Sequence, residues 1–229
     1  MSKTKLNPGK LFIWIYTNDK KPKTIPVMND RWLCEHYTPG EEIEGMNYKW
    51  TLYNPIKHGY PPKDKEMEFP KKLFFILRKP IELQFDYYRY KQNLLIVSEE
   101  FMNFLTENNL KSNFETASLQ IFSKNGASLQ AKSNYYAIRF GKFDDASFHF
   151  DETGKVRSGK EKDSFLLYPN LQLKDEKIQQ KIFFLFEFCY RGFPIFTAEM
   201  KEEIETRFFS PEIYSLKEFP AIFKKEFSF

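Results

Sequence analysis

Residues 81–90 show the clearest alternation of apolar and polar positions in the chain. Ile81, Leu83, Phe85 and Tyr87 occupy every second position, with polar or charged side chains mostly between them. This period of two predicts an antiparallel strand with one buried and one solvent-facing side. Shorter runs rich in aromatic and branched residues predict further strands. They lie at residues 11–16, 31–37, 48–53, 73–77, 94–97, 114–122, 135–140 and 212–216.

Two segments show the signals of a helix start. Ser98 precedes two glutamates, and a hydroxyl cap followed by carboxylates favours the positive end of a helix. Phe101, Phe104 and Leu105 then recur at helical spacing and predict its buried face. Thr197 is the second predicted cap. Its helix carries a similar apolar face, made of Met200, Ile204 and Phe208.

Three C-terminal segments complete the pattern. Residues 182–189 are nearly all apolar and predict a central strand buried on both faces. Residues 143–164 are the most polar stretch and predict a mobile loop or hinge. Residues 217–229 form a short, phenylalanine-rich amphipathic piece, which we expect to dock on the core.

A shift of 99 residues aligns two parts of the chain. It places Ser98 on Thr197 and Phe101 on Met200, and it superimposes the apolar positions of residues 83–87 on those of 182–186. The alternative is a chance match in a chain rich in apolar residues. Together these patterns predict an α+β fold of mostly antiparallel sheets with a few short helices, including two similar strand–helix–strand units.

The length of 229 residues fits one large domain or two small lobes. We predict a β-rich N-terminal lobe at residues 1–92 and an α+β C-terminal lobe at 93–229, with one continuous domain as the alternative. Aromatic residues make up 18% of the chain, which excludes disorder, and no apolar run is long enough to span a membrane. Residues 1–10 are polar and basic, and the apolar run at 11–16 is too short for a signal peptide. We therefore expect a cytoplasmic protein.

The net charge of +4 is concentrated at the N-terminus. Residues 1–92 hold 17 basic and 11 acidic side chains, so the surplus lies entirely there. Such a surface can attract phosphates or acidic partners, and the alternative is a lysine-rich surface that is simply solvated. Lysine accounts for 28 of the 35 basic residues, which argues against a nucleic-acid reader because arginine makes much of the specific contact with bases.

Residues with catalytic or metal-binding potential are few. Cys34 and Cys189 are too few for a disulfide framework and suit buried thiols in a reducing compartment. Cys34 and His36 share a strand face, but no second pair completes a zinc site. The acidic pairs at 144–145 and 151–152 lack the spacing of a calcium loop, and no phosphate-binding glycine motif or nucleophile elbow occurs. We therefore expect no catalytic residues, no metal and no cofactor. A pocket that joins His36 or His58 to carboxylates would favour an enzyme instead.

Aromatic and basic side chains mix in the N-terminal part of the chain. Tyrosine, tryptophan and arginine are enriched where proteins bind each other, and aromatic rings can also stack on single-stranded bases. We predict a partner-binding surface there. Its residues are Trp50, Tyr53, Tyr60, Tyr88 and Arg89.

Several motifs resemble those of a known group of proteins. Leu-Leu-Ile-Val-Ser-Glu-Glu-Phe at 94–101 and Pro-Ile-Phe-Thr-Ala-Glu-Met at 194–200 each join a strand to a Ser/Thr cap and an amphipathic helix. Trp14, Trp32-Leu33-Cys34, Tyr48-Lys49-Trp50-Thr51-Leu52 and Gly59-Tyr60-Pro61-Pro62 complete the set. The chain resembles immunity proteins of bacterial polymorphic-toxin systems, in families forty-three and eleven, which were first catalogued as domains of unknown function. Family forty-three is the more similar.

The resemblance implies a non-enzymatic cytoplasmic protein that binds a cognate toxin and blocks it by occlusion. It supplies no catalytic residues, and it implies neither a cofactor nor a membrane partner. Inhibitors of basic nucleases are often acidic, whereas this chain carries +4. A toxin with an acidic or neutral face therefore fits better. The alternative functions are a single-stranded nucleic-acid-binding protein that uses the same N-terminal surface, and an enzyme of unrecognised chemistry. The sequence indicates no oligomeric state.

Overall fold

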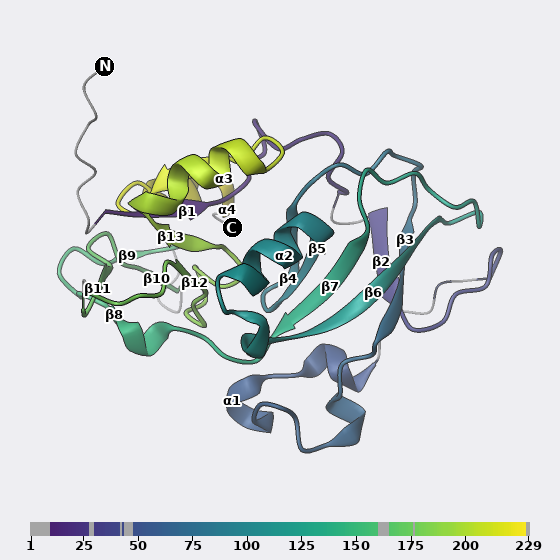
Figure 1. Cartoon of the computed structure of the whole chain (residues 1–229), viewed down its shortest axis with the longest axis horizontal. Coiled ribbons are helices and arrows are strands. Elements are labelled where there is room, and N and C mark those ends of the chain that lie inside the picture. Colours follow the sequence, from purple (N-terminus) through teal and green to yellow (C-terminus); the bar gives the residue numbers. More distant parts are fainter. Residues whose placement is uncertain are drawn as a thin grey trace. The chain divides into compact units, whose positions relative to one another are not determined.

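The structure is a computed structural model that describes residues 10–27, 30–41, 43, 48–159, 165–175 and 177–227. The chain forms two compact units (Figure 1). One contains Pro22–Lys142, and the other joins Met1–Lys21 to Phe143–Phe229. The compact units divide the chain after residues 21 and 142. The predicted division into lobes 1–92 and 93–229 stays a prediction.

The unit of residues 22–142 is built on a six-stranded sheet in the order β2-β3-β6-β7-β5-β4. β3 and β6 are parallel, and every other neighbouring pair is antiparallel. The strands are β2 (Arg31–Cys34), β3 (Lys72–Leu77), β4 (Tyr87–Lys91), β5 (Leu94–Ser98), β6 (Phe114–Ser123) and β7 (Tyr135–Phe140). Short helical turns occur at α1 (Pro55–His58), Lys49–Leu52, Lys65–Met67 and Lys111–Asn113.

This sheet curls until its first and last strands meet. Arg31 on β2 donates from Nη2 to the backbone oxygen of Tyr90 on β4 at 3.1 Å, and the Leu33 backbone N–H donates to the Tyr90 hydroxyl at 3.1 Å. The Arg31 guanidinium lies 4.7 Å from the ring centres of both Tyr88 and Tyr90. The inner face of the sheet therefore encloses aromatic side chains together with a buried cation.

Helix α2 (Glu99–Glu107) covers part of the outer face, across β5 and β7 (Figure 1). Its Phe101, Phe104 and Leu105 are buried, and the Phe101 ring stacks on Tyr87 at 5.7 Å. Ser98 caps the helix, because its hydroxyl oxygen accepts a hydrogen bond from the Phe101 N–H at 3.1 Å. The predicted cap and helix are confirmed.

The second unit contains a four-stranded antiparallel sheet in the order β12-β13-β1-β14. Its strands are β1 (Leu11–Trp14), β12 (Ile182–Phe183), β13 (Ile195–Thr197) and β14 (Ile213–Ser215). Two small ladders pair β8 (Phe148–His149) with β11 (Gln172–Leu173), and β9 (Val156–Arg157) with β10 (Leu166–Leu167). The helices are α3 (Lys201–Arg207), α4 (Phe219–Phe227) and single turns at Asp145–Ser147 and Ala198–Met200.

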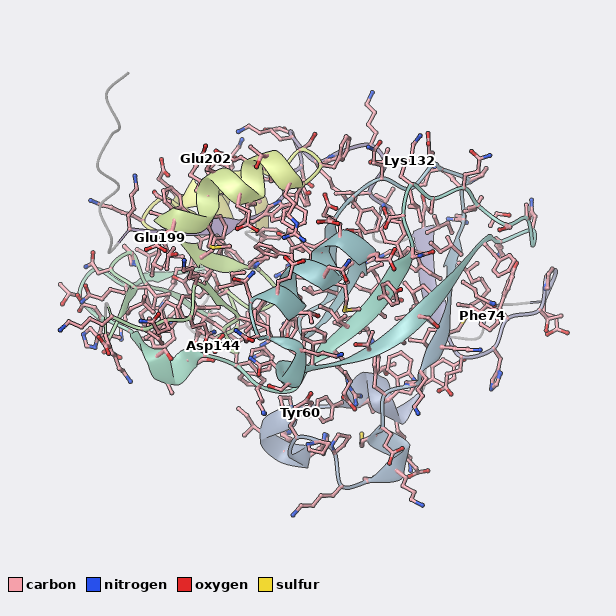
Figure 2. The ribbon with its side chains drawn as sticks, viewed as in Figure 1. Tyr60, Phe74, Lys132, Asp144, Glu199 and Glu202 are labelled. Atoms are coloured by element: carbon pink, nitrogen blue, oxygen red, sulfur yellow. The ribbon has the colours of Figure 1, made fainter. Side chains whose placement is uncertain are left out.

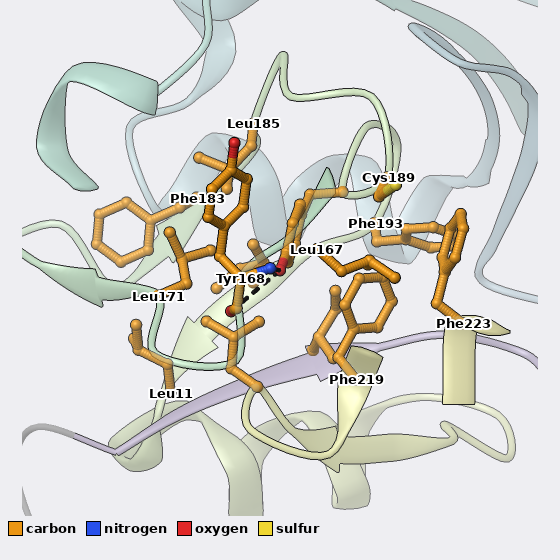
Figure 3. Packing of buried hydrophobic residues seen from close by; sticks show 14 of the residues in the cluster. Leu11, Leu167, Tyr168, Leu171, Phe183, Leu185, Cys189, Phe193, Phe219 and Phe223 are labelled. Carbon is orange, nitrogen blue, oxygen red and sulfur yellow. Dashed lines mark hydrogen bonds between the residues drawn. The ribbon is translucent and has the colours of Figure 1, made fainter. Parts of the chain in front are cut away.

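Alternate residues of β1 face opposite sides of this sheet. Leu11 and Ile13 enter a buried cluster with Phe219 and Phe223 of α4, so the predicted docking of the C-terminal piece is confirmed for its described residues (Figure 3). Within the cluster, the Tyr168 N–H donates to the Tyr190 hydroxyl at 2.8 Å. This bond satisfies a backbone group that would otherwise be buried without a partner.

The two sheets share one strand order. The offset of 99 residues relates β5 to β13 and the start of β6 to that of β14, but it does not relate β4 to β12. β6-β7-β5-β4 and β14-β1-β13-β12 are both antiparallel throughout. In each, a helix joins two strands that have one further strand between them: α2 connects β5 to β6, and α3 connects β13 to β14. The predicted pair of strand–helix–strand units is therefore present. The intervening strand is β7 in one unit and β1 in the other.

Two predicted strands in the unit of residues 22–142 are wrong in whole or in part. Residues 48–53 form a turn of 3-10 helix at Lys49–Leu52. In the predicted strand 81–90, regular pairing begins only at Tyr87, and Asp86 is buried where solvent was expected because it accepts a hydrogen bond from the Ser98 hydroxyl at 2.8 Å. Tyr88 is likewise enclosed by the curl of the sheet.

The strand predicted at 182–189 is not central: β12 lies at the edge of its sheet and ends at Phe183. Beyond it, the Phe184 N–H donates to the Asp144 carboxylate, and the N–H groups of Phe186 and Glu187 donate to Asp145. These two carboxylates replace the neighbouring strand that the apolar run predicts. They lie in the polar stretch 143–164, of which residues 160–164 are outside the described part. The mobility of that stretch stays a prediction.

Candidate partner-binding surface

A buried arginine lies at the end of the curled sheet where β7 finishes. Arg139 sits in an inward-facing position of β7, and its side chain is 2% exposed. Its Nε and Nη2 donate to the Glu115 carboxylate at 2.9 and 2.6 Å. Nη1 donates to the backbone oxygen of Trp50 at 2.9 Å, and Nη2 also donates to that of Met67 at 2.7 Å. Arg139 thus ties residues 48–69, here called the end segment, to the sheet.

Aromatic rings of the end segment surround this guanidinium. Its central carbon lies 4.0 Å from the ring centre of Tyr53 and 4.9 Å from that of Phe69. Trp50 packs edge-on against Phe69 and donates from Nε1 to the Glu35 carboxylate at 2.7 Å. Burial lowers the pKa of Arg139, and the Glu115 carboxylate opposes that shift. Arginine ionises far above neutral pH, so the group keeps its charge.

Tyr60, which follows α1 in the chain, lies beside the aromatic rings that surround Arg139 (Figure 2). Its ring occupies the space above Gly141, where a Cβ atom would lie only 1.7 Å from the ring, so no larger residue fits at that position. The Tyr53 hydroxyl donates to the Gly59 backbone oxygen at 2.7 Å. Burial raises the pKa of Tyr53 to about 12 and also raises that of Tyr60.

The outer side of the end segment is apolar and basic. Leu52 is 71% exposed and Ile56 is 74% exposed. Asn54 lies between them and caps α1, because its Oδ1 accepts from the N–H groups of Ile56 and Lys57 at 3.0 and 3.4 Å. Exposed lysines follow at positions 57, 63 and 65.

The structure brings together three of the five predicted partner-binding residues. Trp50, Tyr53 and Tyr60 all belong to the end segment, with Trp50 and Tyr53 buried and Tyr60 half-buried. Tyr88 and Arg89 lie on β4 instead, where Tyr88 faces the Arg31 guanidinium inside the curl. Whether any of the five contacts a partner stays a prediction.

Sequence reasoning missed the residues that organise this surface. Arg139 shares an alternating face with Tyr135 and Ala137, and a charged residue in an inward position was the available signal. Such a residue is buried only when it is paired. Glu115 gave no comparable sign, because its partner lies on a neighbouring strand.

The residues with catalytic potential are placed as follows. A pocket of about 250 Å³ is lined by Cys34, His36 and Glu41, among others, so His36 and a carboxylate meet there and the enzyme alternative stays a prediction. Burial raises the pKa of Cys34 to about 11, so at neutral pH its sulfur is a thiol, whereas both nucleophilic attack and metal binding require the thiolate. His58 accepts a hydrogen bond at Nδ1 from the Asn54 N–H. Within the described ranges, no group of three or more His, Cys, Asp or Glu side chains is arranged to hold a metal ion.

The fold and the surface define a class: an α+β protein with a curled mixed sheet and an aromatic end segment. The family model described as Immunity protein 43 matches residues 17–229, and the chain belongs to this family. The resemblance seen in the sequence motifs is thereby confirmed. No curated protein matches the chain. In the described part of the chain, no helix has both the length and the apolar character needed to cross a membrane.

Proposed function

We propose that this protein is a non-enzymatic immunity protein that binds a cognate bacterial toxin in the cytoplasm and neutralises it by occlusion. The family match over residues 17–229 is the observation that supports this function most strongly. The neutralised toxin belongs to a polymorphic toxin system, and the immunity protein acts by covering the toxin's active surface. In this mechanism the immunity protein makes and breaks no covalent bond.

The partner surface is proposed to lie in the N-terminal aromatic and basic region, with Trp50, Tyr53 and Tyr60 at its centre. These three residues share one segment that is anchored to the sheet through Arg139. Trp50 and Tyr53 are buried, so in this proposal they hold the segment rigid from beneath, and little entropy is lost when a partner binds its outer side. Tyr88 and Arg89 are proposed as contact residues from the sequence pattern alone.

Direct binding tests this proposal. The reading frame next to the gene for this chain supplies the candidate toxin, which is purified in a catalytically inactive form and titrated with the full chain by calorimetry. We expect a saturable one-to-one complex. No heat change and no complex on a sizing column would contradict the function.

A salt series separates a protein partner from the nucleic-acid alternative. Phosphate contacts release counterions, so affinity for single-stranded DNA or RNA would fall by orders of magnitude between 50 and 200 mM salt, the range over which about 6–10 contacts cost roughly 10³–10⁵-fold. We expect negligible binding of an oligonucleotide at 150 mM salt. Tight, steeply salt-dependent binding would favour the alternative instead.

A further inference from the structure

The end segment presents the most exposed large apolar side chains in the described part of the chain. Leu52 and Ile56 are 71% and 74% exposed, and Val27 follows at 62%. Leu52 and Ile56 are separated by only three residues. Single exposed apolar residues are ordinary on protein surfaces, but two on consecutive turns of one segment form a compact apolar tip.

Internal bonds hold this tip in place. The Thr51 hydroxyl donates to the Tyr48 backbone oxygen at 2.7 Å, next to Leu52. Asn93, in the turn between β4 and β5, donates from its amide to the Tyr53 backbone oxygen at 3.3 Å. Asn54 holds the Ile56 N–H, as described above. The two apolar side chains therefore project from backbone that is already ordered, which reduces the entropic cost of docking.

Charge around the tip is positive. Lys49 pairs with Glu66, and the Asp64 carboxylate accepts from the Glu66 N–H at 3.0 Å, so two of the three carboxylates of the segment are engaged within it. The lysines at 57, 63 and 65 are exposed and form no ion pair in the described structure. An acidic surface is the complement of this arrangement.

We infer that the toxin docks on the end segment, with Leu52 and Ile56 entering an apolar recess whose rim carries carboxylates, and that Arg139 holds the segment ready for docking. This inference rests on the proposed function and assigns its contact surface. Arg139 is a positioning residue in this account. Its side chain donates to the backbone oxygens of Trp50 and Met67, so it holds the end segment to the sheet at two points.

The contact surface is tested with the double variant Leu52→Ser/Ile56→Ser. Both side chains are exposed, so the fold should be retained. We expect affinity for the inactive toxin to fall about 30-fold or more, which corresponds to the roughly 2 kcal/mol that defines a binding hot spot. The matched control is Val27→Ser, an exposed apolar residue of the same unit outside the segment, with no change expected. An affinity within threefold of the parent chain for the double variant would overturn the contact surface.

The acidic rim is tested with Lys57→Glu/Lys63→Glu. Reversing these charges should slow association at least tenfold at low salt, with the difference shrinking as salt is added, because steering by charge is screened. Lys111→Glu, also exposed and in the same unit, is the control and should have a smaller effect. Equal association rates for the double variant and the control would contradict an acidic toxin surface.

Positioning by Arg139 is tested with Arg139→Met beside Arg31→Met. Both arginines are buried in the curled sheet and contact aromatic rings, but Arg139 bonds to the end segment, whereas Arg31 bonds to Tyr90 on β4. We expect Arg139→Met to speed hydrogen exchange within residues 48–69 and to weaken toxin binding at least tenfold. Arg31→Met should leave both unchanged at temperatures where it is folded. Arg139→Lys keeps the charge and serves if the Met variant does not fold; it should show the same changes at smaller size.

The outcomes separate the two levels of the account. Failure of the parent chain to bind the toxin would contradict the proposed function. The positioning role of Arg139 is tested separately, because hydrogen exchange is measured without toxin. Unchanged exchange in residues 48–69 of the folded Arg139 variant would overturn the positioning role. Binding by the parent chain together with full binding by Leu52→Ser/Ile56→Ser would overturn the contact surface and leave the proposed function standing.

Discussion

Single carboxylates decide where backbone leaves regular structure in this protein. In the sequence Asp144 and Asp145 lack the spacing of a calcium loop, and the structure uses both as acceptors for backbone N–H groups. Asp144 Oδ2 accepts from Phe184 at 2.8 Å, and Asp145 accepts from Phe186 and Glu187 at 2.7 and 3.0 Å. Burial raises the pKa of Asp144, while the bond from Phe184 opposes the shift. The acidic pair therefore stabilises the irregular segment that follows β12.

Replacing Asp145 with Ala should destabilise the unit that contains it. Two part-buried N–H groups would lose their acceptor, and a stranded buried donor costs about 1–3 kcal/mol. Chemical denaturation measures the loss. Asp175→Ala is the matched control, because Asp175 makes the same kind of bond to the Lys177 N–H in an exposed turn, where water replaces it. Equal losses in the two variants would contradict this interpretation.

Cys34 should make the stability of the protein fall at alkaline pH. Burial raises the pKa of the folded thiol to about 11, whereas the thiol of an unfolded chain ionises near its ordinary value of 9.0. Between these values ionisation favours the unfolded chain, so stability is lost as pH rises from 9 towards 11. Denaturation curves of the parent chain and Cys34→Ala at pH 8 and pH 10 measure this effect. We expect the parent chain to lose more stability than the variant over that interval, and parallel losses would contradict it.

At the scale of elements, the two helix starts that look alike in sequence differ in structure. Ser98 accepts from the Phe101 N–H and donates to Asp86 Oδ1. Thr197 makes no capping bond, and its buried hydroxyl oxygen has no hydrogen-bond partner. Ser98→Ala should therefore cost about 1–2 kcal/mol, a typical loss for a helix cap. Thr197→Val should cost nothing or be stabilising, because it removes a buried unsatisfied group.

Thermal denaturation of these two variants measures the difference. Both positions end a strand and precede a helix at the same point of the repeat, so each controls for the other. Comparable losses at Ser98 and Thr197 would contradict the assignment of caps.

The local sequence pattern predicts a helix or strand well when the residues within that element determine its hydrogen bonds and its buried face. β5, β6, β7 and α2 fall within a residue or two of their predicted bounds, because alternation and capping are local signals. Residues 48–53 were misassigned because the burial of Trp50 suits a strand and a 3-10 turn equally well. The strand predicted at 182–189 failed because its hydrogen-bond acceptors come from carboxylates some 40 residues away in sequence.

At the scale of the whole molecule, the two sheets share one order although one strand of each comes from a different place in the chain. β7 follows β6 directly, whereas its counterpart β1 is the first strand. A constant offset of 99 residues finds the parts that remain in sequence order and is blind to the strand between them. Only pairing across the sheet shows that the shared strand order includes this strand.

The candidate site could be predicted as a region and not as a set of contacts. Composition and charge indicated the N-terminal aromatic part, which contains the end segment. Which rings face inward depends on the curl of the sheet and on Arg139, and both are set by residues far apart in the chain. The exposure of Leu52 is likewise invisible in a pattern that predicted a strand for residues 48–53.

The central claim is that this chain neutralises a toxin by stoichiometric occlusion. Its most direct test is a titration of the active cognate toxin with increasing amounts of the full chain, followed by separation of the complex in denaturant and refolding of the toxin. We expect toxin activity to fall linearly to zero at one equivalent, and the separated toxin to recover activity with its mass unchanged. Inhibition by far less than one equivalent, or a toxin recovered with altered mass, would show catalytic inactivation and contradict the account.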